Sequence, residues 1–242
     1  MAVILITGAS SGIGRATAEV FLQAGWQVGL LARRADELKT VAAGRENAQI
    51  LPADVTDLAA VEGAVADLTG RFGRLDVLFN NAGIFVPQGM IDEIDPADWA
   101  DSLAVNLGGM FNAARAAFAR MRRQDPQGGR IINNGSISAH APRPGSVCYT
   151  TTKHGVTGLT KSLSLDGRPF DIAAGQIDIG NARTPLLDSV AEGAKALGQE
   201  APPIMEVEDV ARAVLHMASL PPGAHIQTMT IMATNMAYIG RG

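Results

Sequence analysis

The sequence predicts a doubly wound α/β fold, in which one parallel sheet is covered by helices on both faces. Three observations lead to this prediction. Short apolar runs of strand length alternate with longer amphipathic segments along the chain. A glycine-rich turn separates the first apolar run from the first amphipathic segment. No flexible linker, internal repeat or low-complexity run interrupts the 242 residues, so we expect a single domain over 1–242.

The apolar runs predict a seven-stranded parallel sheet, and the segments between them predict the connecting helices. Apolar residues from Ile13 to Ala24 have helical spacing, and Gly25 is placed to end that helix. The stretches 97–123 and 147–167 predict two long helices further along. The strands are expected at 2–7, 26–32, 48–53, 75–80, 129–135, 170–177 and 226–233. Strands and helices that alternate in this way form right-handed βαβ units.

The segment 182–206 departs from this alternation. It combines prolines with a short apolar patch and small residues. It follows the sixth strand at the carboxyl edge of the sheet, where open α/β sheets bind ligands. We interpret it as a variable substrate lid. The alternative is an ordinary surface connection.

Composition and charge restrict the class of partner. The formal charge of −4 and the pI of about 5.6 argue against nucleic acid or an anionic membrane surface. No apolar run reaches the roughly 18 residues of a membrane helix. The one cysteine, Cys148, cannot form an internal disulfide, so we expect a cytoplasmic protein. The four histidines lack metal-ligand spacing, so no metal site is expected.

The glycine-rich turn predicts a dinucleotide site. It reads Thr7-Gly-Ala-Ser-Ser-Gly-Ile-Gly14, and its glycines let backbone N–H groups approach a pyrophosphate at the helix N-terminus. Its position between a strand and an amphipathic helix favours this reading over a plain turn. The expected cofactor-binding residues of this loop are Gly8, Ser10, Ser11, Gly12, Ile13 and Gly14.

The end of the second strand, Leu30-Leu-Ala-Arg-Arg34, indicates which dinucleotide is used. In NAD sites an acidic residue here holds the ribose 2′-hydroxyl, whereas an arginine accommodates the 2′-phosphate of NADP. Position 32 is alanine, and Arg33 and Arg34 follow it, so the sequence favours NADP(H). The alternative is a solvated arginine pair.

Two further strand ends supply candidate cofactor contacts. Asp54-Val55 follows the third strand and is placed to meet the adenine, although Asp54 also suits the cap of a helix that starts near Thr56. The residues after the fourth strand, at the same edge of the sheet, are Asn81, Ala82 and Gly83.

Tyr149 and Lys153 are the candidate catalytic pair. They are four residues apart in a segment with helical spacing, so they share one face of a helix. A lysine ammonium beside a phenol favours the phenolate, so we expect Lys153 to lower the pKa of Tyr149 from about 10. Such a phenol gives a proton to a carbonyl oxygen, or takes one from an alcohol.

Two more polar residues accompany this pair. Ser136 follows the fifth strand, thirteen residues before Tyr149, and its hydroxyl is expected to hold the substrate oxygen. Asn106 lies inside the helical stretch 97–123, where asparagine is unfavourable unless its amide or a local kink has a use.

In order and spacing, these residues resemble the classical short-chain dehydrogenase/reductase family, over essentially the whole chain. The resemblance implies a Rossmann-type fold and a catalytic tetrad in which the tyrosine is the general acid/base, the serine positions the substrate oxygen, the lysine binds the nicotinamide ribose and the asparagine supports a water-mediated proton relay. The tetrad residues are Asn106, Ser136, Tyr149 and Lys153. It also implies nicotinamide contacts from Ile179 and Thr184, and a homotetramer or dimer formed through 97–123 and 147–167.

The chain departs from the family pattern in three places. Gly135 stands where a second serine is frequent, and Gln176-Ile-Asp-Ile-Gly180 replaces the usual Pro-Gly after the sixth strand. The C-terminus, 230–242, does not end on a glycine-rich Asp-Gly-Gly.

The sequence therefore predicts an NADP(H)-dependent oxidoreductase that transfers hydride between nicotinamide and a carbonyl or alcohol substrate. Two alternatives stay open. One is an NADPH-binding regulator that senses redox state without turnover, since fold does not fix function. The other is an NAD-linked alcohol or polyol dehydrogenase, against which Ala32 and Arg33 argue.

Overall fold

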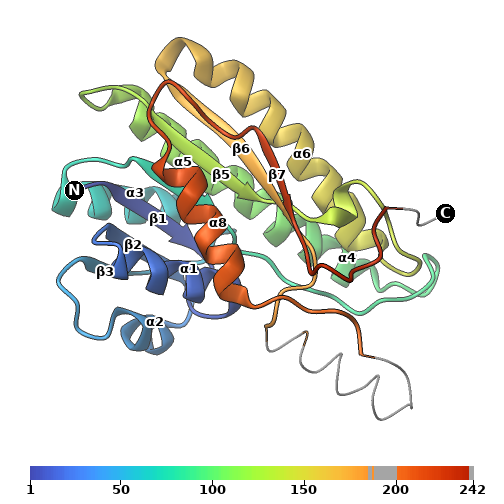
Figure 1. Cartoon of the computed structure of the whole chain (residues 1–242). Coiled ribbons are helices and arrows are strands. Elements are labelled where there is room, and N and C mark those ends of the chain that lie inside the picture. The colour runs from blue at the N-terminus through green and yellow to red at the C-terminus, as the bar shows by residue number, and fades with distance from the viewer. Residues whose placement is uncertain (185–186, 188–200, 240–242) are drawn as a thin grey trace.

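The structure is a computed structural model that describes residues 1–184, 187 and 201–239. All its strands pair in parallel in one sheet with the order β3-β2-β1-β4-β5-β6-β7 (Figure 1). The strands are β1 (Val3–Thr7), β2 (Gln27–Ala32), β3 (Ala48–Pro52), β4 (Val77–Asn80), β5 (Gly129–Asn134), β6 (Ile172–Ile179) and β7 (Thr228–Ile231). The chain winds outward from β1 in both directions, which confirms the predicted doubly wound fold.

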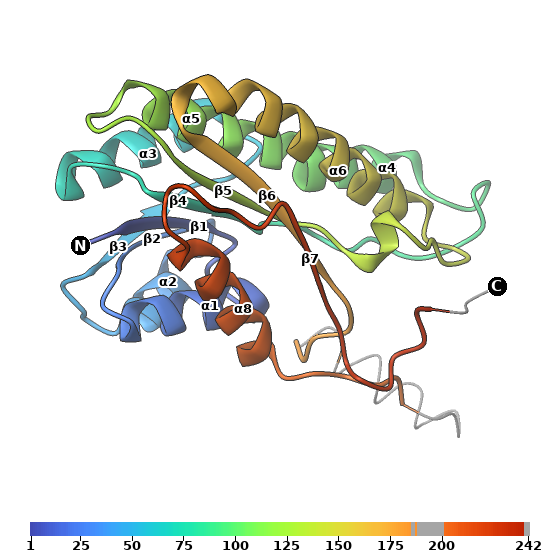
Figure 2. The same ribbon diagram turned by 45° about the horizontal axis from the view of Figure 1, so that its top comes forward.

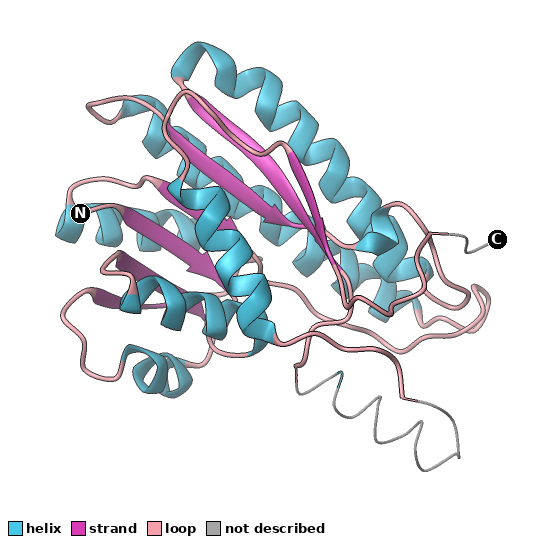
Figure 3. Cartoon of the chain, in the orientation of Figure 1, coloured by secondary structure: helices cyan, strands magenta, loops and turns pink. Residues whose placement is uncertain are grey.

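Helices cover both faces of this sheet (Figure 2). The helices α1, α2 and α8 pack on one face, where they bury one hydrophobic cluster, and α3, α5 and α6 bury a second cluster on the other face. The helices are α1 (Gly12–Gln23), α2 (Ala35–Ala42), α3 (Leu58–Phe72), α4 (Pro96–Leu103), α5 (Met110–Arg123), α6 (Val147–Gly167) and α8 (Val207–Ser219). Figure 3 shows long loops beyond the arrowheads of the strands, at the edge where the predicted site residues lie.

The stretch predicted as a helix over 97–123 is helical throughout, from Pro96 to Arg123, but the type of helix changes in its middle. A π-helical turn, η1 (Ala104–Gly109), separates α4 from α5. Asn106 lies inside this turn, and π turns of this kind are frequent at functional sites. Asparagine is unfavourable inside an α-helix, and the structure places Asn106 in a widened helical turn instead.

The sixth and seventh strands also differ from their predicted limits. The strand expected at 170–177 runs instead from Ile172 to Ile179, because a short 3₁₀ turn, η3 (Arg168–Phe170), and a left-handed Asp171 (φ 54°) precede it. The strand expected at 226–233 is paired only over Thr228–Ile231, where β7 forms the edge of the sheet beside β6.

A row of polar side chains crosses the sheet beneath α6. Asn80, Asn133 and Gln176 occupy paired positions on β4, β5 and β6. Asn80 Nδ2 donates to Asn133 Oδ1 at 3.1 Å, and Asn133 Nδ2 donates to Thr160 Oγ1 of α6 at 2.9 Å. Thr160 Oγ1 lies 3.2 Å from Gln176 Oε1. Each of these four residues is at least 98% buried, so the row satisfies polar groups that have no access to water.

Most of the predicted lid, 182–206, lies outside the described residues. Its two described ends meet, because Ala182 and Met205 form an isolated parallel bridge and Arg183 N donates to Met205 O at 2.8 Å. Within the described part of the chain, none of the helices combines the length and apolar character needed to cross a membrane.

Candidate active site

The glycine-rich loop joins β1 to α1 as the sequence predicts. Gly12 has φ of +52°, which favours glycine, and a Cβ on Gly14 would lie 2.2 Å from the Gly8 carbonyl oxygen. Ser11 precedes α1 without capping it through its side chain, so the first N–H groups of the helix face the loop. This end of α1 suits a phosphate.

The loop forms one wall of a cavity of about 580 Å³ at the carboxyl edge of the sheet. This volume falls within the usual range for small-molecule sites. All the predicted site residues except Gly14 and Ser136 line it. They are Gly8, Ser10, Ser11, Gly12, Ile13, Arg33, Arg34, Asp54, Val55, Asn81, Ala82, Gly83, Asn106, Tyr149, Lys153, Ile179 and Thr184. Gly14 is buried beneath the loop, and Ser136 adjoins Tyr149 behind the wall.

The arginine pair after β2 is anchored at the same cavity. Arg34 Nη2 donates to Ser10 Oγ at 3.2 Å, which ties the end of β2 to the glycine loop. Arg33 Nη1 lies 3.8 Å from Asp54 Oδ2, and 70% of the Arg33 side chain is exposed. Because the Arg33 side chain is mostly exposed and its ion pair with Asp54 is long, its guanidinium is available to bind an anion.

Asp54 forms a turn before α3 and is not its cap. Its Oδ1 accepts from Thr56 N at 2.9 Å and from Thr56 Oγ1 at 2.8 Å, and the backbone N–H in particular lowers the pKa of Asp54. The cap of α3 is Asp57, whose side chain accepts from Ala60 N. The suggested capping role of Asp54 is therefore wrong by three residues.

Asn106 holds the loop that follows β4. Its Oδ1 accepts from Ile84 N at 2.7 Å, and its Nδ2 donates to Ile84 O at 2.9 Å. Gly83 lies directly beneath, where a Cβ would meet Asn106 Oδ1 at 3.2 Å. The π turn thus directs a buried amide at a loop whose residues line the cavity.

Tyr149 and Lys153 lie one helical turn apart at the start of α6. Lys153 Nζ is 5.4 Å from the centre of the Tyr149 ring and donates to Asn134 O, at the end of β5, at 2.8 Å. Ser136 follows β5, and its side chain is close enough to the Tyr149 phenol to influence the pKa of that phenol. The structure therefore brings the predicted serine, tyrosine and lysine together at the exit of β5.

Burial changes the proton affinities of the pair. It lowers the pKa of Lys153 to about 8, because an ammonium is poorly solvated there. It raises the pKa of Tyr149, although the Ser136 side chain and the charge of Arg143 act in the opposite direction. The expected net lowering of the Tyr149 pKa is therefore wrong in this structure, because the cost of burying a phenolate is the largest effect.

Three further residues contribute to the site beyond the predicted catalytic and cofactor-binding residues. The Phe85 ring stacks on Tyr149, with centroids 4.7 Å apart and planes inclined by 19°. Arg143 is close enough to influence the Tyr149 phenol electrostatically. Asp178 is fully buried beside Ser136. A phenylalanine in the loop after β4 gives no sequence signal of stacking, whereas Asp178 lies near the end of β6, within the atypical segment 176–180.

Comparison with known proteins gives the same picture over nearly the whole chain. A family model described as short chain dehydrogenase matches residues 2–195. Sulfoacetaldehyde reductase 2 of Chromohalobacter salexigens is 31% identical, over 98% of this chain and 96% of the relative. A 3-ketoacyl-(acyl-carrier-protein) reductase from Brucella melitensis, complexed with NADH, superposes with a TM-score of 0.85 at 26% identity over 96% of each chain. Levodione reductase superposes with a TM-score of 0.86 at 28% identity, over 96% of this chain and 95% of that one.

Proposed function

This chain belongs to the short-chain dehydrogenase family, and from that premise we propose that it is an NADP(H)-dependent reductase of a carbonyl substrate, with Tyr149 as the general acid/base. Membership of the family makes it an oxidoreductase with a nicotinamide cofactor. The proposal adds the choice of NADP(H), the catalytic residues and the substrate class.

One observation carries the proposal: Tyr149 and Lys153 line the same cavity as the glycine loop, with Ser136 against the tyrosine. A binding protein without turnover has no need of this combination. Helix α6 holds the tyrosine and lysine on one face, and the exit of β5 supplies the serine. A carbonyl oxygen that contacts Tyr149 and Ser136 is therefore held between a proton donor and a second hydroxyl.

The bound nicotinamide supplies or accepts the hydride, and the residues of the chain manage the proton. The raised pKa keeps Tyr149 protonated at neutral pH, so its hydroxyl gives a proton to the developing alkoxide in reduction. Lys153 is positively charged below about pH 8, and its charge favours the phenolate that remains. Asn106 holds the 82–84 loop against the cofactor side of the cavity.

Arg33 supports NADP(H) as the cofactor. Its guanidinium is mostly exposed at the end of β2, where position 32 has no carboxylate to repel a 2′-phosphate. NAD is the second candidate, because the Brucella reductase was solved with NADH and Asp54 lies near Arg33. Binding of NADPH and NADH distinguishes the two. We expect NADPH to bind more tightly than NADH. We also expect Arg33→Ala to weaken the binding of NADPH and to leave that of NADH unchanged.

We infer a small or medium-sized ketone or aldehyde as substrate. Phe85 stacks on the catalytic tyrosine and offers an apolar surface at the cavity mouth. The named relatives are reductases of carbonyl compounds, which agrees with this class.

We also infer a homotetramer or dimer, since Phe111 on α5 and Leu165 on α6 are 52% and 60% exposed. Light scattering of the purified chain measures that state.

The test of the function is NADPH oxidation with a panel of ketones, aldehydes, quinones and 3-oxoacyl thioesters, run beside Tyr149→Phe. Turnover that is lost in the variant supports the proposal, since Phe keeps the ring and removes only the hydroxyl. Turnover that is unchanged in the variant contradicts the role of Tyr149. Tight NADPH binding with no turnover across the panel favours a redox-sensing regulator instead.

A further inference from the structure

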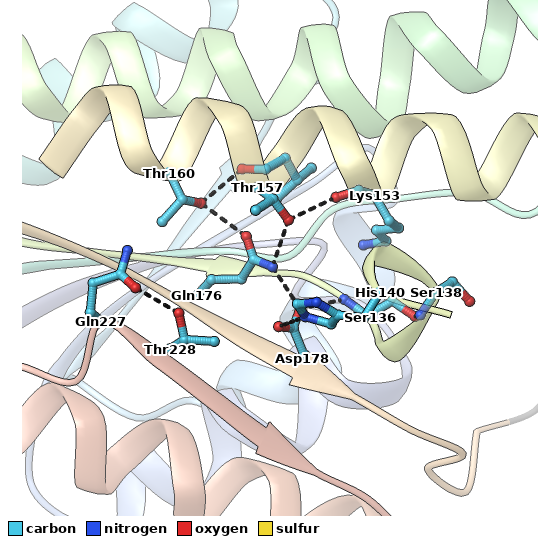
Figure 4. A network of polar contacts seen from close by, with 11 residues as sticks. Ser136, Ser138, His140, Lys153, Thr157, Thr160, Gln176, Asp178, Gln227 and Thr228 are labelled. Atoms are coloured by element: carbon cyan, nitrogen blue, oxygen red, sulfur yellow. Dashed lines mark hydrogen bonds and ion pairs between the residues drawn. The ribbon is translucent and has the colours of Figure 1, made fainter. Parts of the chain in front are cut away.

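The exit of β6 holds a buried carboxylate that the proposed reaction does not use. Asp178 is completely buried, and both of its carboxylate oxygens have hydrogen-bonding partners (Figure 4). Its Oδ1 accepts from Ser136 N at 3.0 Å and from Gln176 Nε2 at 2.6 Å, and its Oδ2 lies 2.7 Å from His140 Nε2. Its two oxygens thus meet two N–H donors and one imidazole nitrogen, which donates when Nε2 carries the ring proton.

Three different elements fix the position of this carboxylate. Gln176 lies two residues earlier on β6, on the same face, and contacts Thr157 and Thr160 of α6 at 3.1 and 3.2 Å. Its amide is therefore oriented with Nε2 toward Asp178. His140 ends the short 3₁₀ turn η2 (Ile137–Ala139) and reaches back to the carboxylate, with 40% of its side chain exposed.

Gly135 leaves the space that Asp178 occupies. A Cβ on Gly135 would lie 2.1 Å from Asp178 Oδ1 and 2.7 Å from Gln176 Nε2. Real Cβ atoms do not approach an oxygen so closely, so a side chain at 135 and the carboxylate of 178 exclude each other. Two departures from the family pattern, 43 positions apart, are thus one structural feature.

The titratable groups around Asp178 belong to the site. They are His140, directly after η2, and Tyr149 and Lys153 on α6. From β7, the residue at the position paired with Asp178 is Thr230. The negative charge of Asp178 raises the pKa of both Lys153 and Tyr149. For Lys153 this opposes the effect of burial and helps to keep the ammonium charged.

We propose that Asp178 is a positioning residue of this site, which holds the backbone of Ser136 and acts on Lys153 as a fixed negative charge, clamped by Gln176 and His140. The role rests on the proposed function of Ser136, Tyr149 and Lys153, but its physical consequences are measurable without turnover.

The test follows the titration of Lys153 by NMR in the full chain labelled with ¹³C-lysine. The chain has four lysines, and Lys153→Arg identifies the signal. We expect Asp178→Asn to lower the Lys153 pKa from about 8 by roughly 0.5 to 1 unit. Asp166→Asn, the same change at an exposed position on α6, serves as the matched control and leaves it unchanged. A folded Asp178→Asn chain with an unshifted Lys153 overturns the proposal.

A double-variant cycle tests the steric part. Gly135→Ala should lower the melting temperature by several degrees in the native background and by much less when Asp178→Ala is also present. Equal losses in both backgrounds overturn the link between the two positions. An Asp178→Asn chain that fails to fold also overturns the positioning role, because the amide has the shape of the carboxylate. Absence of turnover in the native chain contradicts the proposed function and leaves both measurements valid.

Discussion

The two ends of β5 use buried polar groups in opposite ways. At the amino end, Arg130 extends to the last turn of α8 and the loop beyond it, and its guanidinium donates to four carbonyl oxygens. These belong to Met217, Leu220, Pro221 and Ala224. At the carboxyl end, Lys153 has one such carbonyl, that of Asn134, and otherwise faces the cavity. The guanidinium thus contacts four carbonyl oxygens, whereas the ammonium contacts one.

The amides near these ends show the same contrast. Gln124 binds only backbone groups, those of Leu75 and Gly128, at 2.8 to 2.9 Å. Gln176 binds only side chains, on α6 and β6. Backbone partners are set by the fold, whereas side-chain partners depend on several positions at once. We infer that the amino end of β5 serves stability, and that the carboxyl end is the part of the strand that serves the proposed reaction.

The strongest test of this contrast is Lys153→Met. We expect turnover to fall by at least about 100-fold, because the charge beside Tyr149 is lost. The free energy of unfolding should not fall, since the variant no longer buries an ammonium that burial already disfavours. Steady-state kinetics and urea unfolding measure the two effects. A chain that unfolds more easily with its turnover intact would reverse the assignment.

The converse experiment is Arg130→Met at the other end of the strand. Removal of the guanidinium leaves buried carbonyls without donors, so the free energy of unfolding should drop by about 3 kcal/mol. Turnover per folded molecule should stay at the native level. Thermal and urea unfolding provide the measurement, and Arg212→Met on the exposed side of α8 is the control. A large loss of turnover in the folded variant would contradict a purely structural role.

The pH dependence of stability should sharpen the same contrast. Lys153 has a pKa of about 8 in the folded chain against 10.5 for a free lysine, so between these values the unfolded chain binds more protons. The Lys153 contribution to stability therefore increases as pH rises from about 8 toward 10.5, by on the order of 2 kcal/mol. The difference between the native chain and Lys153→Met, measured by urea unfolding at several pH values, isolates it. If the difference in unfolding free energy between the two chains does not change with pH, the lowered pKa of Lys153 is contradicted.

The smallest expected effect is that of Phe85→Ala at the cavity mouth. Phe85 is 52% exposed, and its stacking on Tyr149 is worth about 1 kcal/mol. We expect KM for an apolar carbonyl substrate to rise several-fold, with kcat nearly unchanged. Phe85→Leu should recover part of the loss. A fall in kcat with KM constant would mean that the ring orients Tyr149 and does not bind substrate.

The sequence predicted the parts of the site that depend on local spacing. The glycine loop, the Tyr149–Lys153 pair and the unusual setting of Asn106 are all features of one element or one turn, so periodicity reveals them. Asp178 and Ser136 meet only because β5 and β6 pair with Asn134 opposite Ile177. Register between strands is a property of the whole sheet, and the spacing of residues along the chain does not encode it directly.

The Tyr149 pKa illustrates a second limit. Its direction depends on how deeply the phenol is buried relative to the distance of each charge, and the sequence supplies neither quantity. The predicted strand limits at 170–177 and 226–233 failed for a related reason. Hydrophobicity marks buried residues, whereas a left-handed residue or an unpaired neighbour decides where pairing begins.

The polar row of Asn80, Asn133 and Gln176 has a consequence for folding fidelity. Apolar strands of similar composition can align in several shifted registers, and apolar contacts alone penalise a shifted pairing weakly. A shift of β5 by one residue turns Asn133 to the opposite face of the sheet. The amide of Asn80 and the hydroxyl of Thr160 then lose a partner in a dry environment, at about 1 to 3 kcal/mol for each unmet group. The row therefore raises the free energy of a misaligned pairing at the centre of the sheet, and so favours the register in which the candidate active site forms.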